Sequence, residues 1–185
     1  MERRNPWKRL SHRLVYKTPW MEVYEDKVTR PDGSPGQYSY VQVGTGVYIV
    51  AITDDDKIYL VGQFRYPTST FSWELPAGAA DGDDLLAEAK RELKEETGLE
   101  AKNWRKIGRL QVVNGISQDW SHVFIATGLS QTGKHQQEEE GIQEMQAFSL
   151  PEILRMIDLG ELSCGQSMAA LMLAAKHLGL LTQKE

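Results

Sequence analysis

Hydrophobic and polar residues alternate along the first half of the chain in the manner of β-strands. Residues 21–30 and 37–43 carry β-branched and aromatic side chains on either side of the turn sequence PDGSPG, which predicts a hairpin over residues 20–43. A second hairpin is expected from GVYIVAIT, residues 46–53, and IYLVGQFRY, residues 58–66. The charged run between them is typical of a solvated turn.

The pattern changes to a helical period after residue 83. A helix is predicted from about residue 83 to residue 97, and Gly98 is a suitable residue to end it. The sheet and helix pattern predicts an α/β (α+β) sandwich, in which helices cover a mixed sheet. We expect an N-terminal β unit over residues 1–43 and a second, larger domain over residues 44–185. Further strands are expected at residues 106–113, 121–129 and 142–150, and two final helices at residues 151–160 and 165–180.

Composition narrows the class of protein. The 185 residues are 41% hydrophobic and 25% charged, which suits one globular domain with a small appendage. The net charge of −5 and the lack of a basic stripe argue against a nucleic-acid-binding protein. No signal peptide or membrane span is apparent, so we expect a cytoplasmic protein. Cys164 is the only cysteine, which excludes an intramolecular disulfide.

The predicted acidic helix holds the main chemical signal. Glu88, Glu92, Glu95 and Glu96 fall within roughly a third of the helix circumference. Arg91 lies within reach of Glu88 and Glu95, which leaves Glu92 and Glu96 one turn apart without a cationic neighbour in sequence. A solvated acidic face is one interpretation. The other is a site for a divalent cation with oxygen ligands, magnesium being the natural candidate.

The loop before this helix favours the metal site. PAGAADG, residues 76–82, leads from a strand into the helix, and its backbone carbonyl groups can complete a coordination shell.

At this point the sequence resembles a known family. RELKEETGL, residues 91–99, with Gly78 upstream, resembles the Nudix box, and WELPAG at residues 73–78 and QFRYP at residues 63–67 resemble its ADP-ribose pyrophosphatase branch. The chain departs from the family pattern in one place. Four residues instead of five separate Gly78 from Asp83, which stands at the acidic position of the box where the family has Glu. We expect an altered loop geometry there.

The resemblance implies a Nudix-like α/β/α sandwich that hydrolyses the diphosphate bond of a nucleoside diphosphate sugar. ADP-ribose, cleaved to AMP and ribose 5-phosphate, is the leading substrate, and Mg²⁺, or else Mn²⁺, is the implied cofactor. The metal ligands would be Glu92, Glu96 and the backbone of Ala77. Arg91, Gly78 and Gly98 would be structural, with Arg91 paired to Glu95. Homodimerisation through the N-terminal β unit is also implied. The alternative is a catalytically weak binding or regulatory module.

Three further sites complete the functional prediction. Arg65 is a candidate phosphate contact, and the alternative interpretation is an exposed arginine on a strand. Glu74 is either structural or a support for the site. The relatives carry a catalytic or metal-binding Glu in a loop corresponding to HQQEEEGIQEM, residues 135–145, so the general base is expected to be Glu139 or Glu140, with Glu95 the candidate if neither acts.

The substrate preference depends on a position beyond the box. Asn114 of an Asn-Gly pair stands where the ADP-ribose branch usually has Pro, which predicts a tight turn. We therefore expect ADP-ribose to be accepted while another nucleoside diphosphate sugar competes with it.

Overall fold

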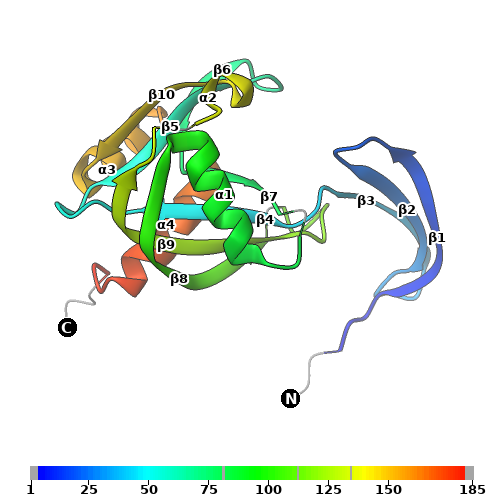
Figure 1. The fold of residues 1–185 in the computed structure, drawn as a ribbon. Helices are drawn as coiled ribbons and strands as arrows, with labels where there is room; N and C mark the ends of the chain where they lie inside the picture. The colour runs from blue at the N-terminus through cyan, green and yellow to red at the C-terminus, as the bar shows by residue number, and fades with distance from the viewer. Residues whose placement is uncertain (1–3, 81, 112, 134, 182–185) are drawn as a thin grey trace. The chain divides into compact units, whose positions relative to one another are not determined.

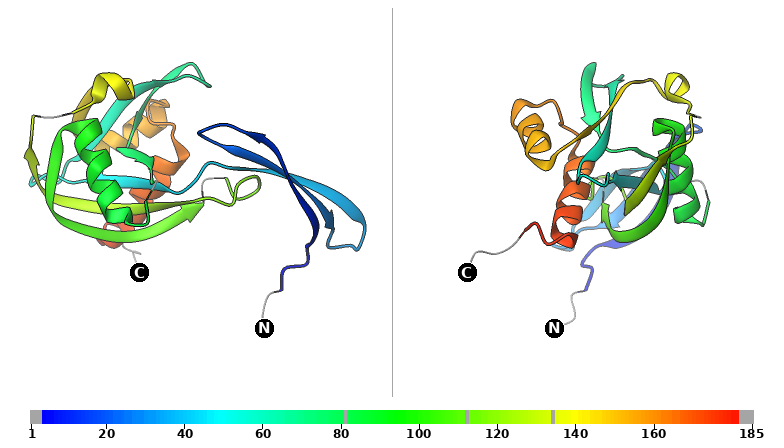
Figure 2. Two further views of the ribbon diagram at one scale, coloured as in Figure 1. Left: turned by 45° about the vertical axis from the view of Figure 1, so that its right-hand side comes forward. Right: turned by 60° about the vertical axis from the view of Figure 1, so that its left-hand side comes forward.

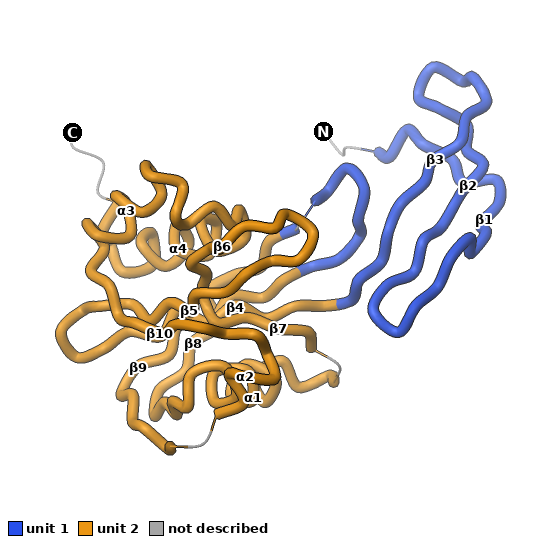
Figure 3. The backbone as a smooth tube through the Cα atoms, turned by 90° about the horizontal axis from the view of Figure 1, so that it is seen from above, with its two compact units in different colours: residues 1–44, 111–120 blue, residues 45–110, 121–185 orange. Residues whose placement is uncertain are grey.

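The computed structural model describes residues 4–80, 82–111, 113–133 and 135–181. It divides into two compact units, one of residues 1–44 with 111–120 and the other of residues 45–110 with 121–185 (Figure 3). In the described residues, no helix is long and apolar enough to cross a membrane.

The N-terminal unit is built on a three-stranded antiparallel sheet. Its strands are β1 (Lys8–Lys17), β2 (Glu22–Thr29) and β3 (Pro35–Gln42), in that order. The predicted hairpin is confirmed, because β2 pairs with β3 from Glu22–Gln42 to Thr29–Pro35. Strand β1 was not predicted. All ten of its residues are exposed. Strands are recognised in a sequence by apolar residues that alternate with polar ones because one face is buried, and β1 has no buried face.

Residues 111–120 join this unit although they are remote in sequence. The amide of Val41 donates to the carbonyl of Ile116 at 2.8 Å, and the amide of Val43 donates to Asp119 Oδ2 at 2.6 Å. The expected Asn-Gly turn is present, and the amide of Ile116 closes it on the carbonyl of Val113 at 3.0 Å. The turn is therefore a part of the unit that the sequence analysis did not assign to it.

The second unit contains a four-stranded mixed sheet. Its order is β7 (Ala77–Ala79), β4 (Gly46–Ala51), β9 (Trp120–Gln131) and β8 (Leu99–Gln111). Strand β4 is antiparallel to β7 and parallel to β9, so the sheet is mixed, as predicted.

Helices cover both faces of this sheet. Val47 and Ile49 of β4 pack in one cluster with Leu93 of α1 (Leu85–Thr97), whereas Val50 faces a second cluster with Leu171 of α4 (Gly165–His177). This alternation follows the period of two in a strand. Helix α1 lies over one face and α4 over the other (Figure 1), which confirms the α/β/α sandwich.

A separate sheet corrects the second predicted hairpin. Strand β5 (Ile58–Arg65) lies between β10 (Ile142–Phe148) and β6 (Thr70–Glu74), and β4 belongs to the other sheet. A single bridge between Ile52 and Ile58 joins the ends of β4 and β5. The hairpin prediction was wrong because the turn only reverses the chain. It does not determine whether two buried strands pair with each other or with other strands.

The remaining helices largely follow the sequence. Helix α3 (Leu150–Leu159) begins at a capping box made by Ser149 and Glu152, with Pro151 in its first turn, and α4 follows it. A short helix, α2 (Gln137–Glu140), occupies part of the segment predicted to be a loop.

Candidate active site

Local capping fixes both ends of the acidic helix α1. Asp84 Oδ1 accepts hydrogen bonds from the amides of Leu86 and Ala87, each at 3.1 Å. Gly98 ends the helix with a φ of 67°, a conformation that favours glycine, as the sequence predicts. Asp83 is exposed just before the cap, and residue 81 of the shortened loop lies outside the described residues.

Glu92 lies directly on the backbone of β7. A Cβ atom added to Gly78 would lie 2.2 Å from Glu92 Cδ, well inside contact distance. Only glycine leaves room for the carboxylate at this point. Gly78 therefore has a physical role in holding Glu92 between the helix and the strand.

Glu96 is the more deeply buried of the two carboxylates. Its side chain accepts a hydrogen bond from the amide of Ala77 at 2.9 Å, and the residue is 5% exposed. Burial raises the pKa of Glu96 to about 8, although the Ala77 amide acts in the opposite direction. Burial also raises the pKa of Glu92. The chain thus confines two acidic groups where negative charge is poorly solvated.

Arg91 organises the outer part of the acidic cluster. Its guanidinium forms ion pairs with Glu88 at 2.9 Å and Glu95 at 2.6 Å, as the sequence predicts. It also binds Glu92 Oε1 at 2.6 Å and the carbonyl of Ala79 at 3.2 Å. The expectation that Glu92 lacks a cationic partner was therefore wrong. The Arg91 side chain extends toward β7, and its guanidinium contacts the carboxylate of Glu92, the next residue in sequence.

Arg65 and Glu74 form a bidentate ion pair. The Nε atom of Arg65 lies 3.0 Å from Glu74 Oε1, and Nη2 lies 2.7 Å from Oε2. Glu74 is 5% exposed, whereas the Arg65 side chain is about half exposed. Glu74 therefore supports Arg65 from the buried side. The pair lines a cavity of about 390 Å³ together with Tyr48, Ser72 and Cys164.

The charges of buried carboxylates act on the residues that line this cavity. Burial is the main cause that raises the pKa of Tyr48, and the charges of Glu74 and Glu96 raise it further. The charge of Arg65 acts on Glu96 in turn. The guanidinium group of Arg65 and the carboxylate of Glu96 are therefore close enough for their charges to interact.

Helix α2 brings the acidic loop to the same region. The amide of Gln136, which precedes α2, donates to the carbonyl of Glu95 at 2.7 Å. Burial is the largest cause of the raised pKa of Glu92 and Glu96, and the charge of Glu140 raises both further. Glu139 is exposed on the same helix. Of the two predicted bases, Glu140 is the one that this electrostatic coupling favours.

The donor set suits a hard divalent cation completed by other ligands. In the part of the chain that the structure describes, no three side chains of His, Cys, Asp or Glu converge closely enough to hold a metal ion. Magnesium commonly takes one or two protein carboxylates, with substrate phosphates and water as its other ligands. Glu92, Glu96 and the adjacent Ala77 backbone fit that requirement, with Glu96 bearing no Lys or Arg partner among the described ion pairs.

Sequence reasoning missed several residues of this region. Tyr48 and Gln166 line the Arg65 cavity, and Gln137 contacts the end of α1. A phenol within the apolar run of β4 was a signal that could have singled out Tyr48. The two glutamines carry no comparable signal, since their roles depend on which elements the fold brings together.

Comparison with known proteins identifies the family. The NUDIX domain model matches residues 43–163, and the model of the nucleoside diphosphate sugar hydrolase N-terminal domain matches residues 7–41. The chain therefore belongs to the Nudix family and is a Nudix hydrolase.

Two relatives and one solved structure are similar to this chain over most of its length. An ADP-ribose pyrophosphatase of Bacillus subtilis (strain 168) is 30% identical, the match covering 83% of this chain and 84% of the relative. An ADP-ribose pyrophosphatase of Mycobacterium tuberculosis is 34% identical, with 74% and 68% covered. A crystal structure of an ADP compounds hydrolase superposes with a TM-score of 0.83 over 97% of both chains, at 19% identity. That likeness shows that the fold is shared.

The contact between Gly78 and Glu92 generates a prediction. Gly78→Ala should push the Glu92 carboxylate out of place, because the new Cβ overlaps it. We expect the variant to fold and to lose most of the thermal stabilisation that added Mg²⁺ gives the wild type. Gly115→Ala, whose Cβ meets nothing within 4 Å, is the control and should keep that stabilisation. An unchanged magnesium response in Gly78→Ala would contradict the role assigned to Gly78.

Proposed function

We propose that this protein hydrolyses the diphosphate bond of a nucleoside diphosphate sugar in a Mg²⁺-dependent reaction. ADP-ribose, giving AMP and ribose 5-phosphate, is the leading substrate. The observation that carries the proposal is the buried Glu92–Glu96 pair, together with the charge interaction between Glu96 and Arg65. The relatives named ADP-ribose pyrophosphatase support the choice of substrate.

Each group has a distinct task in this proposal. A bound divalent cation neutralises diphosphate oxygens and lowers the pKa of the attacking water. Glu92 and Glu96, with the Ala77 backbone, would hold that cation. Arg65, oriented by Glu74, offers its remaining N–H groups to a phosphate oxygen. Glu140 accepts the proton of the water, and Arg91 holds Glu95 and Glu92 in place.

A binding or regulatory module is the second candidate function, favoured by the loop that is one residue shorter than the family pattern. A panel of nucleoside diphosphate sugars, dinucleotides and nucleoside triphosphates, assayed with Mg²⁺ and product identification, distinguishes the two. Turnover of a nucleoside diphosphate sugar supports the enzyme. Tight binding without turnover supports the module. Because Asn114 replaces the usual Pro, we expect ADP-ribose to be accepted while another nucleoside diphosphate sugar of the panel competes with it, so ADP-ribose should not have by far the highest kcat/KM.

The metal assignment generates a prediction for the two buried carboxylates. Glu92→Gln and Glu96→Gln should each abolish most of the turnover, because the amide keeps the shape and removes the charge that attracts a cation. Excess chelator should do the same to the wild type. Glu100→Gln, at an exposed position paired with Lys94, is the control and should retain activity. Full turnover by either variant would refute the metal assignment.

The base assignment generates a separate prediction. Glu140→Gln should lower kcat by about a hundredfold or more with little change in substrate affinity, in line with general base catalysis. Glu139→Gln, on the same helix, should be close to the wild type. If neither substitution nor their combination slows turnover at saturating Mg²⁺, the base lies elsewhere and Glu95 becomes the candidate.

We also propose a homodimer formed through the N-terminal sheet. Strand β1 leaves large apolar side chains exposed, among them Leu10 at 65% and Tyr16 at 54%, and exposed apolar patches commonly mark protein–protein interfaces. Light scattering at micromolar concentration should therefore report twice the mass of the chain. Leu10→Lys and Tyr16→Lys together should shift it to the monomer. A monomeric wild type would contradict this proposal.

A further inference from the structure

We propose that Gln137 is a positioning residue that latches α2, and with it Glu140, to the end of α1. The catalytic consequence rests on the proposed function. The latch itself rests on contacts that the structure shows.

The C-terminal end of α1 explains why a latch forms there. The last four carbonyl groups of a helix have no partner within it. In α1 these are the carbonyls of residues 94–97, and that of Lys94 accepts from the amide of Gly98. The carbonyls of Glu95 and Glu96 are the ones that meet the incoming α2 segment.

Gln136 and Gln137 satisfy these two carbonyls. The backbone amide of Gln136 donates to Glu95 at 2.7 Å, and the side-chain Nε2 of Gln137 donates to Glu96 at 2.9 Å. The first bond is available to any residue except proline. The second requires a side chain with a donor of the right length, so the identity of residue 137 matters.

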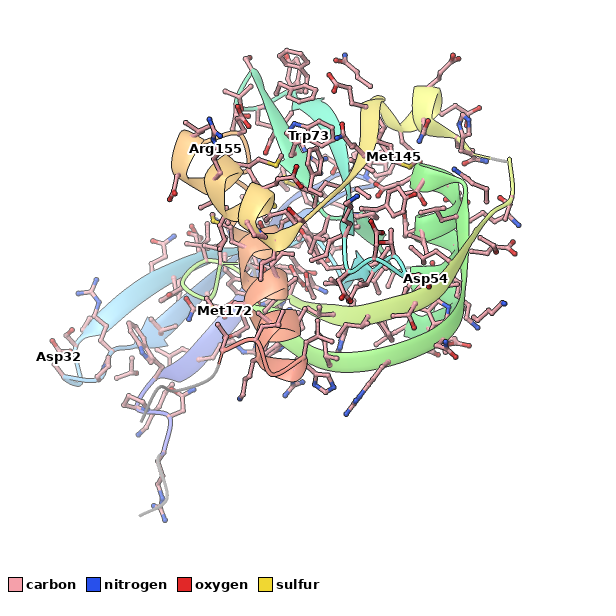
Figure 4. All side chains as sticks on the ribbon, turned by 90° about the vertical axis from the view of Figure 1, so that its left-hand side faces the viewer. Asp32, Asp54, Trp73, Met145, Arg155 and Met172 are labelled. Carbon is pink, nitrogen blue, oxygen red and sulfur yellow. The ribbon has the colours of Figure 1, made fainter. Side chains whose placement is uncertain are left out.

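The Gln137 side chain also reaches the neighbouring strand. Its Nε2 lies 3.7 Å from the sulfur of Met145 on β10, a residue labelled in Figure 4. The views in Figure 2 show α2, in yellow, beside the end of α1 where the chain turns into β8. The half-buried side chain thus ties α2 to two elements of the unit.

The Gln137 contact opposes an electrostatic repulsion between the carboxylates of α2 and those of α1. Helix α2 carries three consecutive exposed carboxylates, Glu138 to Glu140, and Glu140 interacts unfavourably with Glu92 and Glu96. Without a cation, these like charges favour movement of α2 away from α1. A neutral amide donor opposes that movement without adding charge to the site.

The short length of α2 links this latch to Glu140. The amide of Glu140 donates to the carbonyl of Gln136 at 3.0 Å, and Gly141 ends the helix in the left-handed conformation. One turn of helix therefore connects the Gln137 contact to the proposed base. Loss of the contact should reduce the population in which Glu140 faces the buried carboxylates.

The latch can be tested without any assay of activity. Gln137→Met keeps the length of the side chain and removes its donor. Hydrogen exchange at the amides of residues 136–141 should become about fivefold faster in this variant, as expected for loss of one hydrogen bond. Gln143→Met, the same change at an exposed position of β10, is the control and should leave that exchange unchanged. Equal exchange in Gln137→Met and the wild type would overturn the latch.

Kinetics then test whether the latch acts through Glu140. Gln137→Met should lower kcat by about fivefold with KM unchanged, and it should add nothing to the loss already caused by Glu140→Gln. A full further loss in the double variant would show that Gln137 does not act through Glu140 and would overturn its positioning role. If the wild type turns over no substrate while exchange responds as predicted, the proposed function fails and the latch stands.

Discussion

The burial of two carboxylates side by side is the constraint on which the rest of the site depends. Glu92 and Glu96 are one helical turn apart, and each is at most 6% exposed. Such a pair is costly unless hydrogen bonds or cations compensate it. Gly78 gives Glu92 its space, Arg91 gives it a partner, and the Ala77 amide binds Glu96. Strand β7, only three residues long, supplies two of these three features.

The core of the unit holds α1 in the orientation that this arrangement requires. Ala89 and Leu93 are completely buried against β4, and they lie on the same helix as the acidic residues. Because residues three and four apart share a face, anchoring the apolar stripe also fixes the carboxylates beside it. The stability of the sandwich and the geometry of the site are therefore set by the same contacts.

The sequence predicts features that depend on nearby residues better than features that depend on pairing across the fold. The end of α1 at Gly98 and the Arg91–Glu95 ion pair follow from spacing along one helix, and the structure contains both. Strand β1 was missed because none of its residues is buried. The separation of β4 from β5 was missed because the partners of a buried strand are chosen by residues elsewhere in the chain. The Arg65–Glu74 pair lies between these cases. Both residues were singled out, but the register pairs Arg65 with Thr70 and Glu74 with Val61, so the ion pair forms because the Arg65 side chain extends along the β5–β6 pair to Glu74.

The distribution of charge gives the proposed cation a role in substrate binding as well as in chemistry. The guanidinium of Arg65 is already paired with Glu74, and that of Arg91 is shared among Glu88, Glu92 and Glu95. Both cations are therefore offset by carboxylates, while Glu96 and Glu140 add further acidic groups. A diphosphate that entered this region alone would meet acidic groups in excess over basic ones. In the proposed function, a divalent cation held by Glu92 and Glu96 would reverse that balance, and the acidic helix would attract an anionic substrate only together with the metal.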